Sequence, residues 1–68
     1  MKDSNTLLSK REREVLCLLV EGNSYKSIAA VCSISFFTVN THLKNIYKKI
    51  GVTSATAAVT KALRQQLV

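Results

Sequence analysis

Apolar residues recur every three to four positions along most of the chain, which is the spacing of helices with one buried face. No stretch alternates apolar and polar residues for long enough to suggest a β-sheet. The sequence therefore predicts an all-α fold of four helices. The first helix is expected to begin after Ser9 and to stop before Gly22, and a short second helix is expected after Asn23 or Ser24. The third is expected over residues 36–50, before Gly51. The fourth is expected over residues 55–66, after Ser54.

The third predicted helix has two contrasting sides. Successive residues turn by about 100° around a helix axis, so one arc collects the core candidates Val39, Leu43, Ile46 and Ile50. The opposite arc contains no acid and collects Phe37, Asn40, Thr41, Lys44 and Lys48. A solvated helix face usually mixes both signs of charge, because opposite charges four residues apart stabilise a helix. An arc with cations alone suits a partner that supplies the negative charge, such as phosphate.

The side chains on this arc are suited to reading base pairs. An asparagine can bond an adenine edge twice, a lysine can reach guanine O6 or N7, and an apolar group can contact a thymine methyl. A tight turn at Ser33 and Ile34 joins the second and third helices, which is the layout of a helix-turn-helix. We therefore expect double-stranded DNA as the partner, with the third helix in the major groove. The expected base contacts are Phe37, Asn40, Thr41 and Lys44, and the expected phosphate contacts are Ser24, Tyr25, Lys26, Thr38 and Lys48.

Several of these residues also have a purely structural interpretation. Phe37 could fold back over the edge of the domain as peripheral core. Thr38 could form a local capping bond with the turn at Ser35 instead of binding a phosphate at the positive end of the helix dipole. Tyr25 could simply pack inside the domain, and Lys26 could be an ordinary solvated lysine. The sequence leaves both interpretations open.

Composition and charge narrow the class of protein. The chain has 68 residues, so we expect a flexible lead-in or linker remnant over residues 1–6 and one domain over residues 7–68. The formal net charge is +6 and no acid follows Glu21, which favours either a polyanionic partner or a solubilising surface. No segment is long and apolar enough for a signal peptide or a membrane span, so a cytoplasmic location without membrane contact is expected.

Enzymatic or metal chemistry has no visible basis in the sequence. There is no carboxylate pair, nucleophile–base pair or phosphate-binding loop, so we expect no enzyme. Two Cys and one His are too few for a four-ligand zinc site, and no cofactor or metal is expected. Cys17 falls opposite the apolar stripe of its helix and is expected to be exposed, whereas Cys32 is expected in the core.

Four stretches resemble the signature of the LuxR/GerE-type helix-turn-helix domain. Residues 8–16 (LSKREREVL) resemble the family's opening, and residues 22–29 (GNSYKSIA) resemble its second helix. Residues 35–43 (SFFTVNTHL) resemble the start of its recognition helix, and residues 46–52 (IYKKIGV) resemble the end. The match covers residues 7–63, and spaced motifs in the right order make it specific.

The resemblance implies a four-helix DNA-binding domain of the kind that is often C-terminal in NarL/FixJ-type response regulators or quorum-sensing regulators. Such domains typically bind DNA as dimers through the fourth helix. The resemblance thus implies a homodimer here, with contacts from Ala55, Ala58, Val59 and Ala62. Ala58, Val59 and Ala62 belong to an apolar stripe that runs to Leu63, and this stripe could equally serve only the core.

The chain departs from the family pattern at positions that concern binding. Asn40 stands where the family often has a basic residue, and Phe37 stands where it usually has a polar one. Ala55 occupies a place where the family commonly has Arg. The target sequence of a relative therefore does not transfer to this chain.

Two other functions stay as alternatives. The first is the promoter-binding region 4 of a sigma factor, which shares the Arg-Glu-x-Glu-Val-Leu opening and would bind core RNA polymerase. The fourth helix and the Thr-Val-x-x-His pattern favour the LuxR-type interpretation, in which RNA polymerase is a further candidate partner. The second is a protein-interaction bundle that does not bind DNA, which the missing cations at Asn40 and Ala55 would support. A steep fall of DNA affinity with salt would separate DNA binding from that alternative.

Overall fold

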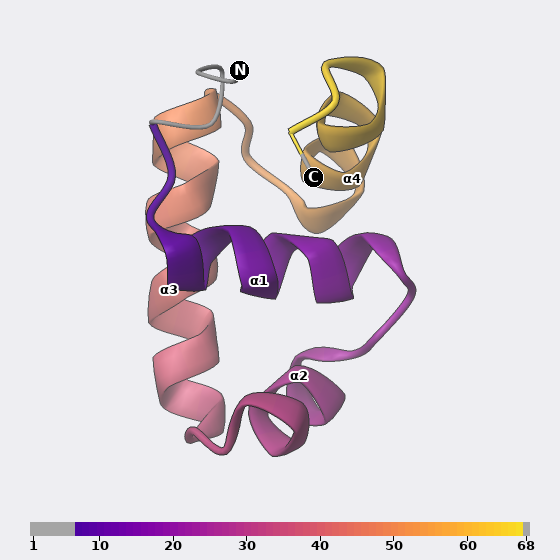
Figure 1. Ribbon diagram of the computed structural model, residues 1–68. Helices are drawn as coiled ribbons and strands as arrows, with labels where there is room; N and C mark the ends of the chain where they lie inside the picture. Colours follow the sequence, from indigo (N-terminus) through magenta and orange to yellow (C-terminus); the bar gives the residue numbers. More distant parts are fainter. Residues whose placement is uncertain (1–6, 68) are drawn as a thin grey trace.

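The computed structural model describes residues 7–67 and shows the four expected helices (Figure 1). They are α1 (Lys10–Val20), α2 (Tyr25–Cys32), α3 (Phe36–Ile50) and α4 (Ala55–Arg64). No strand occurs in this part of the chain, so the predicted all-α class is confirmed. The lead-in predicted at residues 1–6 lies outside the described residues. Within residues 7–67, no helix has the length and apolar character needed to cross a membrane.

A serine caps the N-terminus of each of these helices, which explains where they begin. Each hydroxyl oxygen accepts a hydrogen bond from the backbone amide three residues further on, at 3.0–3.1 Å. These bonds satisfy amides that a helix leaves without a partner. Glu12 also accepts from the amide of Ser9 at 2.9 Å, so the capping-box spacing at the start of α1 forms as such a box. The four caps are Ser9, Ser24, Ser35 and Ser54.

Residues with positive φ end the first three helices. Gly51 ends α3 with φ 75°, and Gly22 follows α1 with φ 99°. Glycine adopts such angles without strain because it has no Cβ. Ser33 ends α2 with φ 57° and begins the tight turn that leads into α3, as predicted. The short turn keeps α2 and α3 together as a helix-turn-helix.

The fourth helix is shorter than predicted. It ends at Arg64 and not at Gln66, which has φ 55°. The chain turns there so that Leu67 packs in the core, and the Leu67 amide donates to the carbonyl of Ala62 at 2.9 Å. Leu63, predicted on the apolar stripe, is exposed instead. The sequence gives no signal for this turn, because neither Gly nor Pro follows Arg64.

The described helices enclose one core. Leu16, Ile28, Leu43 and Ile46 are its largest fully buried side chains, and they come from three helices. The four core positions predicted for α3 are all buried, which confirms the interpretation of that arc. Cys32 is only half-buried and packs at the edge of the core.

The arrangement leaves one side of α3 uncovered. Figure 1 shows α3 running along one edge of the molecule, with α1 crossing in front of it. In the same view α2 lies near the N-terminal end of α3 and α4 stands to the right, while no other described helix lies to the left of α3. Because α1 also packs against α2 and α4, it links the helix-turn-helix to the fourth helix.

Candidate nucleic-acid interface

The uncovered side of α3 carries the residues predicted to contact bases. Phe37, Thr41 and Lys44 are exposed, and Asn40 is half-buried beside them. With Lys48, which is also exposed, they fall within roughly one third of the helix circumference at about 100° per residue. The structure therefore brings all four predicted base-contact residues to one accessible surface. We call this surface the α3 outer face, made of Phe37, Asn40, Thr41, Lys44 and Lys48.

The two adjacent phenylalanines at the start of α3 have different surroundings. Phe37 is 76% exposed and does not pack against the core, so the alternative that it folds back as peripheral core is wrong. Phe36 is 57% exposed and tilts against Tyr25 of α2, with ring centroids 6.2 Å apart. No aromatic ring in residues 7–67 contacts Phe37. One ring thus joins α3 to α2, and the other points away from the domain.

The residues predicted to contact phosphate are accessible, most of them near the start of a helix. Ser24 and Lys26 are exposed at the N-terminus of α2, and Thr38 is half-buried in the first turn of α3. Helix N-termini favour anions because of their unpaired amides and the positive end of the helix dipole. Within residues 7–67, no hydrogen bond or ion pair engages the ammonium groups of Lys26, Lys44 or Lys48. These cations are therefore available to a ligand.

Thr38 and Tyr25 each have a partner inside the domain. The Thr38 hydroxyl lies 2.9 Å from the Ser35 hydroxyl, so the local capping bond is present. The Tyr25 hydroxyl lies 2.7 Å from that of Tyr47, which joins the first residue of α2 to the C-terminal part of α3. Burial raises the pKa of Tyr47, and the hydrogen bond with Tyr25 raises it further. A hydroxyl can both donate and accept, so phosphate contacts by Thr38 and Tyr25 stay predictions.

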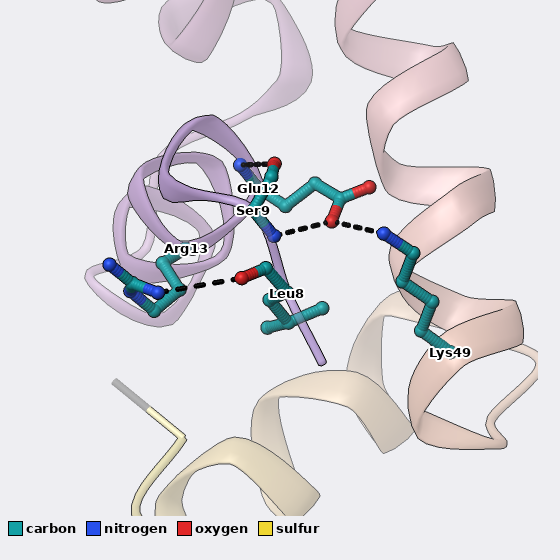
Figure 2. A network of polar contacts seen from close by, with 5 residues as sticks. All are labelled: Leu8, Ser9, Glu12, Arg13 and Lys49. Atoms are coloured by element: carbon teal, nitrogen blue, oxygen red, sulfur yellow. Dashed lines mark hydrogen bonds and ion pairs between the residues drawn. The ribbon is translucent and has the colours of Figure 1, made fainter. Parts of the chain in front are cut away.

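A polar network ties α3 to the start of α1 (Figure 2). Lys49 Nζ donates to Glu12 Oε1 at 2.7 Å, and the same oxygen accepts from the Ser9 amide at 2.9 Å. Beside them, Arg13 Nη1 donates to the carbonyl of Leu8 at 3.4 Å. The Glu12 side chain is 7% exposed and that of Lys49 is 38% exposed. Burial acts to raise the pKa of Glu12, but the hydrogen bonds from Lys49 and Ser9 outweigh it and hold this pKa below its usual value.

A second lysine holds the C-terminus of α3. Lys61 of α4 donates to the carbonyl of Ile50 at 2.6 Å, which satisfies one of the carbonyls left unpaired at a helix end. Neither this contact nor the pair of Lys49 with Glu12 is visible in the sequence. The spacing of Glu12 from Ser9 indicates only a helix cap, because its ion-pair partner Lys49 is 37 positions away in the sequence. Both lysines therefore position α3, in contrast to the lysines of the α3 outer face.

Two of the four residues predicted at a dimer contact are not available for one. Ala58 and Ala62 are fully buried within the single chain, because their small side chains let α4 pack closely on the core. For these two residues the dimer prediction is wrong, and core packing is what the structure shows. Ala55 and Val59 are half-buried and keep accessible surface.

Both cysteines line a groove between α1 and the end of α2. Cys17 and Cys32 are half-buried free thiols, so Cys17 is less exposed than predicted. Burial raises the pKa of Cys17, and the nearby carboxylate of Glu21 raises it further. A thiol with a raised pKa is a poor nucleophile and metal ligand. Within the described range, no three His, Cys, Asp or Glu side chains are grouped so that they could hold a metal ion.

Comparisons with known proteins agree with this geometry. A family model for bacterial regulatory proteins of the luxR family matches residues 6–62. The chain is 46% identical over 61 residues to the probable transcriptional regulatory protein NarL of Mycobacterium tuberculosis, covering 90% of the chain and 28% of NarL. It is also 46% identical to the spore germination protein GerE of Bacillus subtilis, covering 90% of the chain and 82% of GerE. The crystal structure of the response regulator ChrA from a heme-sensing two-component system matches with a TM-score of 0.86 and 49% identity, covering 90% of this chain and 30% of ChrA.

The fold, the α3 outer face and these matches define a helix-turn-helix DNA-binding domain of a transcription regulator. The chain belongs to the LuxR family of bacterial regulatory proteins, because the family model covers most of it and the match to GerE covers most of that protein. The resemblance seen in its motifs is thereby confirmed, and the sigma-factor alternative is set aside. The chain spans less than a third of the length of NarL and of ChrA.

Proposed function

We propose that this LuxR-family domain recognises a specific duplex sequence by placing the α3 outer face in the major groove. The observation that carries the proposal is that this face is accessible, bears the cations Lys44 and Lys48, and has no acid anywhere on its helix. The major groove is about 12 Å wide and admits an α-helix. The 15 residues of α3 make a helix about 22 Å long at 1.5 Å per residue, which is enough to follow the groove across several base pairs.

Two polar side chains of the face are suited to base edges in this arrangement. The amide of Asn40 is suited to an adenine edge, and the ammonium group of Lys44 is suited to guanine O6 and N7. Thr41 lies between them on the accessible side. The pattern of these groups would select the sequence, because base edges differ in the groove.

Phosphate contacts would fix the orientation of the domain without selecting a sequence. Ser24, Tyr25 and Lys26 at the start of α2 would lie against the backbone, as the first helix of a helix-turn-helix pair does. Thr38 at the start of α3 and Lys48 in its last turn would hold phosphates near the two ends of the recognition helix. The local partners of Thr38 and Tyr25 would orient their hydroxyl groups for this contact.

A homodimer on DNA is the second part of the proposal. Ala55, Val59 and Leu63 follow one another at four-residue spacing on α4, and all keep accessible surface. Two copies joined through this strip would present two α3 helices to inverted half-sites. Residues 7–67 share one core, which supports the proposal that they act as one domain in such a complex.

Selection of bound duplexes from a random pool tests DNA binding. We expect an enriched motif and an affinity that falls steeply as salt rises. Lys44→Ala and Asn40→Ala should each cost about 1–3 kcal/mol of specific binding, whereas Lys48→Ala should weaken all duplexes alike and make the salt slope shallower by about one. Arg64→Ala removes an exposed cation of α4 and is the matched control. No enriched duplex at low salt, or an unchanged affinity after Lys44→Ala, would contradict the proposal.

Dimer formation is tested on the selected duplex. A motif with inverted half-sites is expected, and Leu63→Glu should abolish cooperative binding to two half-sites while leaving the affinity for one half-site unchanged. Equal cooperativity in wild type and variant would place the dimer contact elsewhere. Contact with RNA polymerase and a cytoplasmic location stay predictions, and a binding assay with purified polymerase tests the first of them.

A further inference from the structure

Phe37 is an apolar group exposed on a surface that is otherwise polar and cationic. It lies in the first turn of α3 and is 76% exposed. About one helical turn further along the same face lies Thr41, whose hydroxyl donates to the carbonyl of Phe37 at 3.2 Å. That hydroxyl is therefore engaged by the helix backbone. The N-terminal half of the α3 outer face is less polar than the half that holds Lys44 and Lys48.

The exposed ring is not required by the packing of the domain. Phe36 already supplies the aromatic contact between α3 and Tyr25 of α2. Phe37 touches neither the core nor another ring within residues 7–67. An apolar surface of this size is unfavourable in water unless something covers it. The cations on the same face indicate that a polyanion covers it, which favours a base edge over a protein surface.

Only one base pair presents an apolar group in the major groove, namely the pair that carries the thymine C5 methyl. Recognition helices contact base edges mainly through their N-terminal residues, and Phe37 is the second residue of α3. On this basis, and resting on the proposed function, we propose that Phe37 packs on a thymine C5 methyl in each half-site. The domain then prefers a 5-methylpyrimidine at that one position.

Deoxyuridine tests this contact, because it differs from thymidine only by the missing methyl and pairs identically. The probe is the duplex selected by the wild-type chain, with each thymidine replaced in turn. Removing one buried methyl should weaken wild-type binding about fourfold at a single thymidine in each half-site. Phe37→Ala should bind the unmodified duplex more weakly and should no longer distinguish thymidine from deoxyuridine at that position.

The controls separate this contact from general effects of the substitution. Val31→Ala removes another exposed apolar side chain, 62% exposed, which lines the groove beside α1 instead of the α3 outer face. It should keep the wild-type response to deoxyuridine. The thermal unfolding of Phe37→Ala should match that of the wild type, because an exposed side chain contributes little to stability. Phe37→Leu keeps an apolar group and should retain part of the discrimination.

Each outcome decides a different claim. If no duplex is enriched, the proposed function fails. If a motif is enriched but no thymidine shows a methyl effect that depends on Phe37, the present inference fails while DNA recognition by α3 stands. If Phe37→Ala alters self-association and leaves DNA affinity unchanged, the ring belongs to a protein contact and the inference is overturned.

Discussion

We expect the buried carboxylate of Glu12 to stabilise the position of α3 through its ion pair with Lys49. Glu12→Gln removes the charge but keeps an oxygen for the Ser9 amide, because glutamine also serves in a capping box. Lys49→Met removes the cation and keeps most of its alkyl chain. The two single variants and the double variant form a cycle that isolates the interaction between the two side chains.

The expected magnitude follows from the geometry. A hydrogen bond to a charged group contributes about 1.5–3 kcal/mol, compared with about 0.5–1.5 kcal/mol for a neutral one. Glu12 accepts two such bonds while 7% exposed, but Lys49 is 38% exposed, so water screens part of the attraction. We therefore expect Glu12→Gln to cost about 1–2 kcal/mol and the coupling energy with Lys49 to be about 1 kcal/mol.

Urea unfolding followed by far-ultraviolet circular dichroism measures these energies. In a domain of this size the cost for Glu12→Gln corresponds to a fall of about 4–16 °C in Tm. Because the folded pKa of Glu12 is lowered, its stabilisation is fully present above the unfolded pKa of about 4.3. It is lost as pH falls through the folded pKa. The difference between wild type and Glu12→Gln should therefore shrink below about pH 4.

Two matched comparisons serve as controls for this prediction. The exposed pair Arg11 and Glu14, 3.5 Å apart on α1, should show a coupling below about 0.5 kcal/mol. Lys48→Met changes the neighbouring exposed lysine and should alter stability by less than about 0.5 kcal/mol. Two results would contradict a stabilising ion pair between Glu12 and Lys49. One is a coupling energy below about 0.3 kcal/mol, and the other is an equal loss of unfolding free energy for Glu12→Gln at acid and neutral pH.

Other contacts within the domain carry predictions of their own. Tyr25→Phe should cost about 0.5–1.5 kcal/mol in urea unfolding, because it leaves the Tyr47 hydroxyl without its partner; an additive effect with Tyr47→Phe would show that the bond is absent. Gly51→Ala should cost about 1–2 kcal/mol because it places a Cβ at φ 75°, and Gly51→Asn, which tolerates that angle better, should cost less. Lys61→Met should lower the unfolding free energy by about 1 kcal/mol and leave the salt slope of DNA binding unchanged; a shallower slope would mean that Lys61 contacts phosphate.

Local features of this protein were readable from its sequence. The serine caps, the glycine at the end of α3 and the buried arc of that helix depend on residues within one or two turns of each other. Because that range is short, spacing and side-chain chemistry decide it without knowledge of the rest of the fold. The same holds for the family motifs and for the absence of acids on α3, which together predicted the class of protein and its outer face.

Tertiary packing alone decided which side chains are covered and by what. A helical stripe indicates that a residue faces inward, but it does not identify the residue it meets. Phe36 and Phe37 are identical in chemistry, yet only the position of Tyr25 in α2 gives one of them a partner. Ala58 is buried because α4 packs against the core, and Lys49 reaches Glu12 because α1 crosses α3. Such contacts join residues far apart along the chain, so their geometry exists only after the helices have assembled.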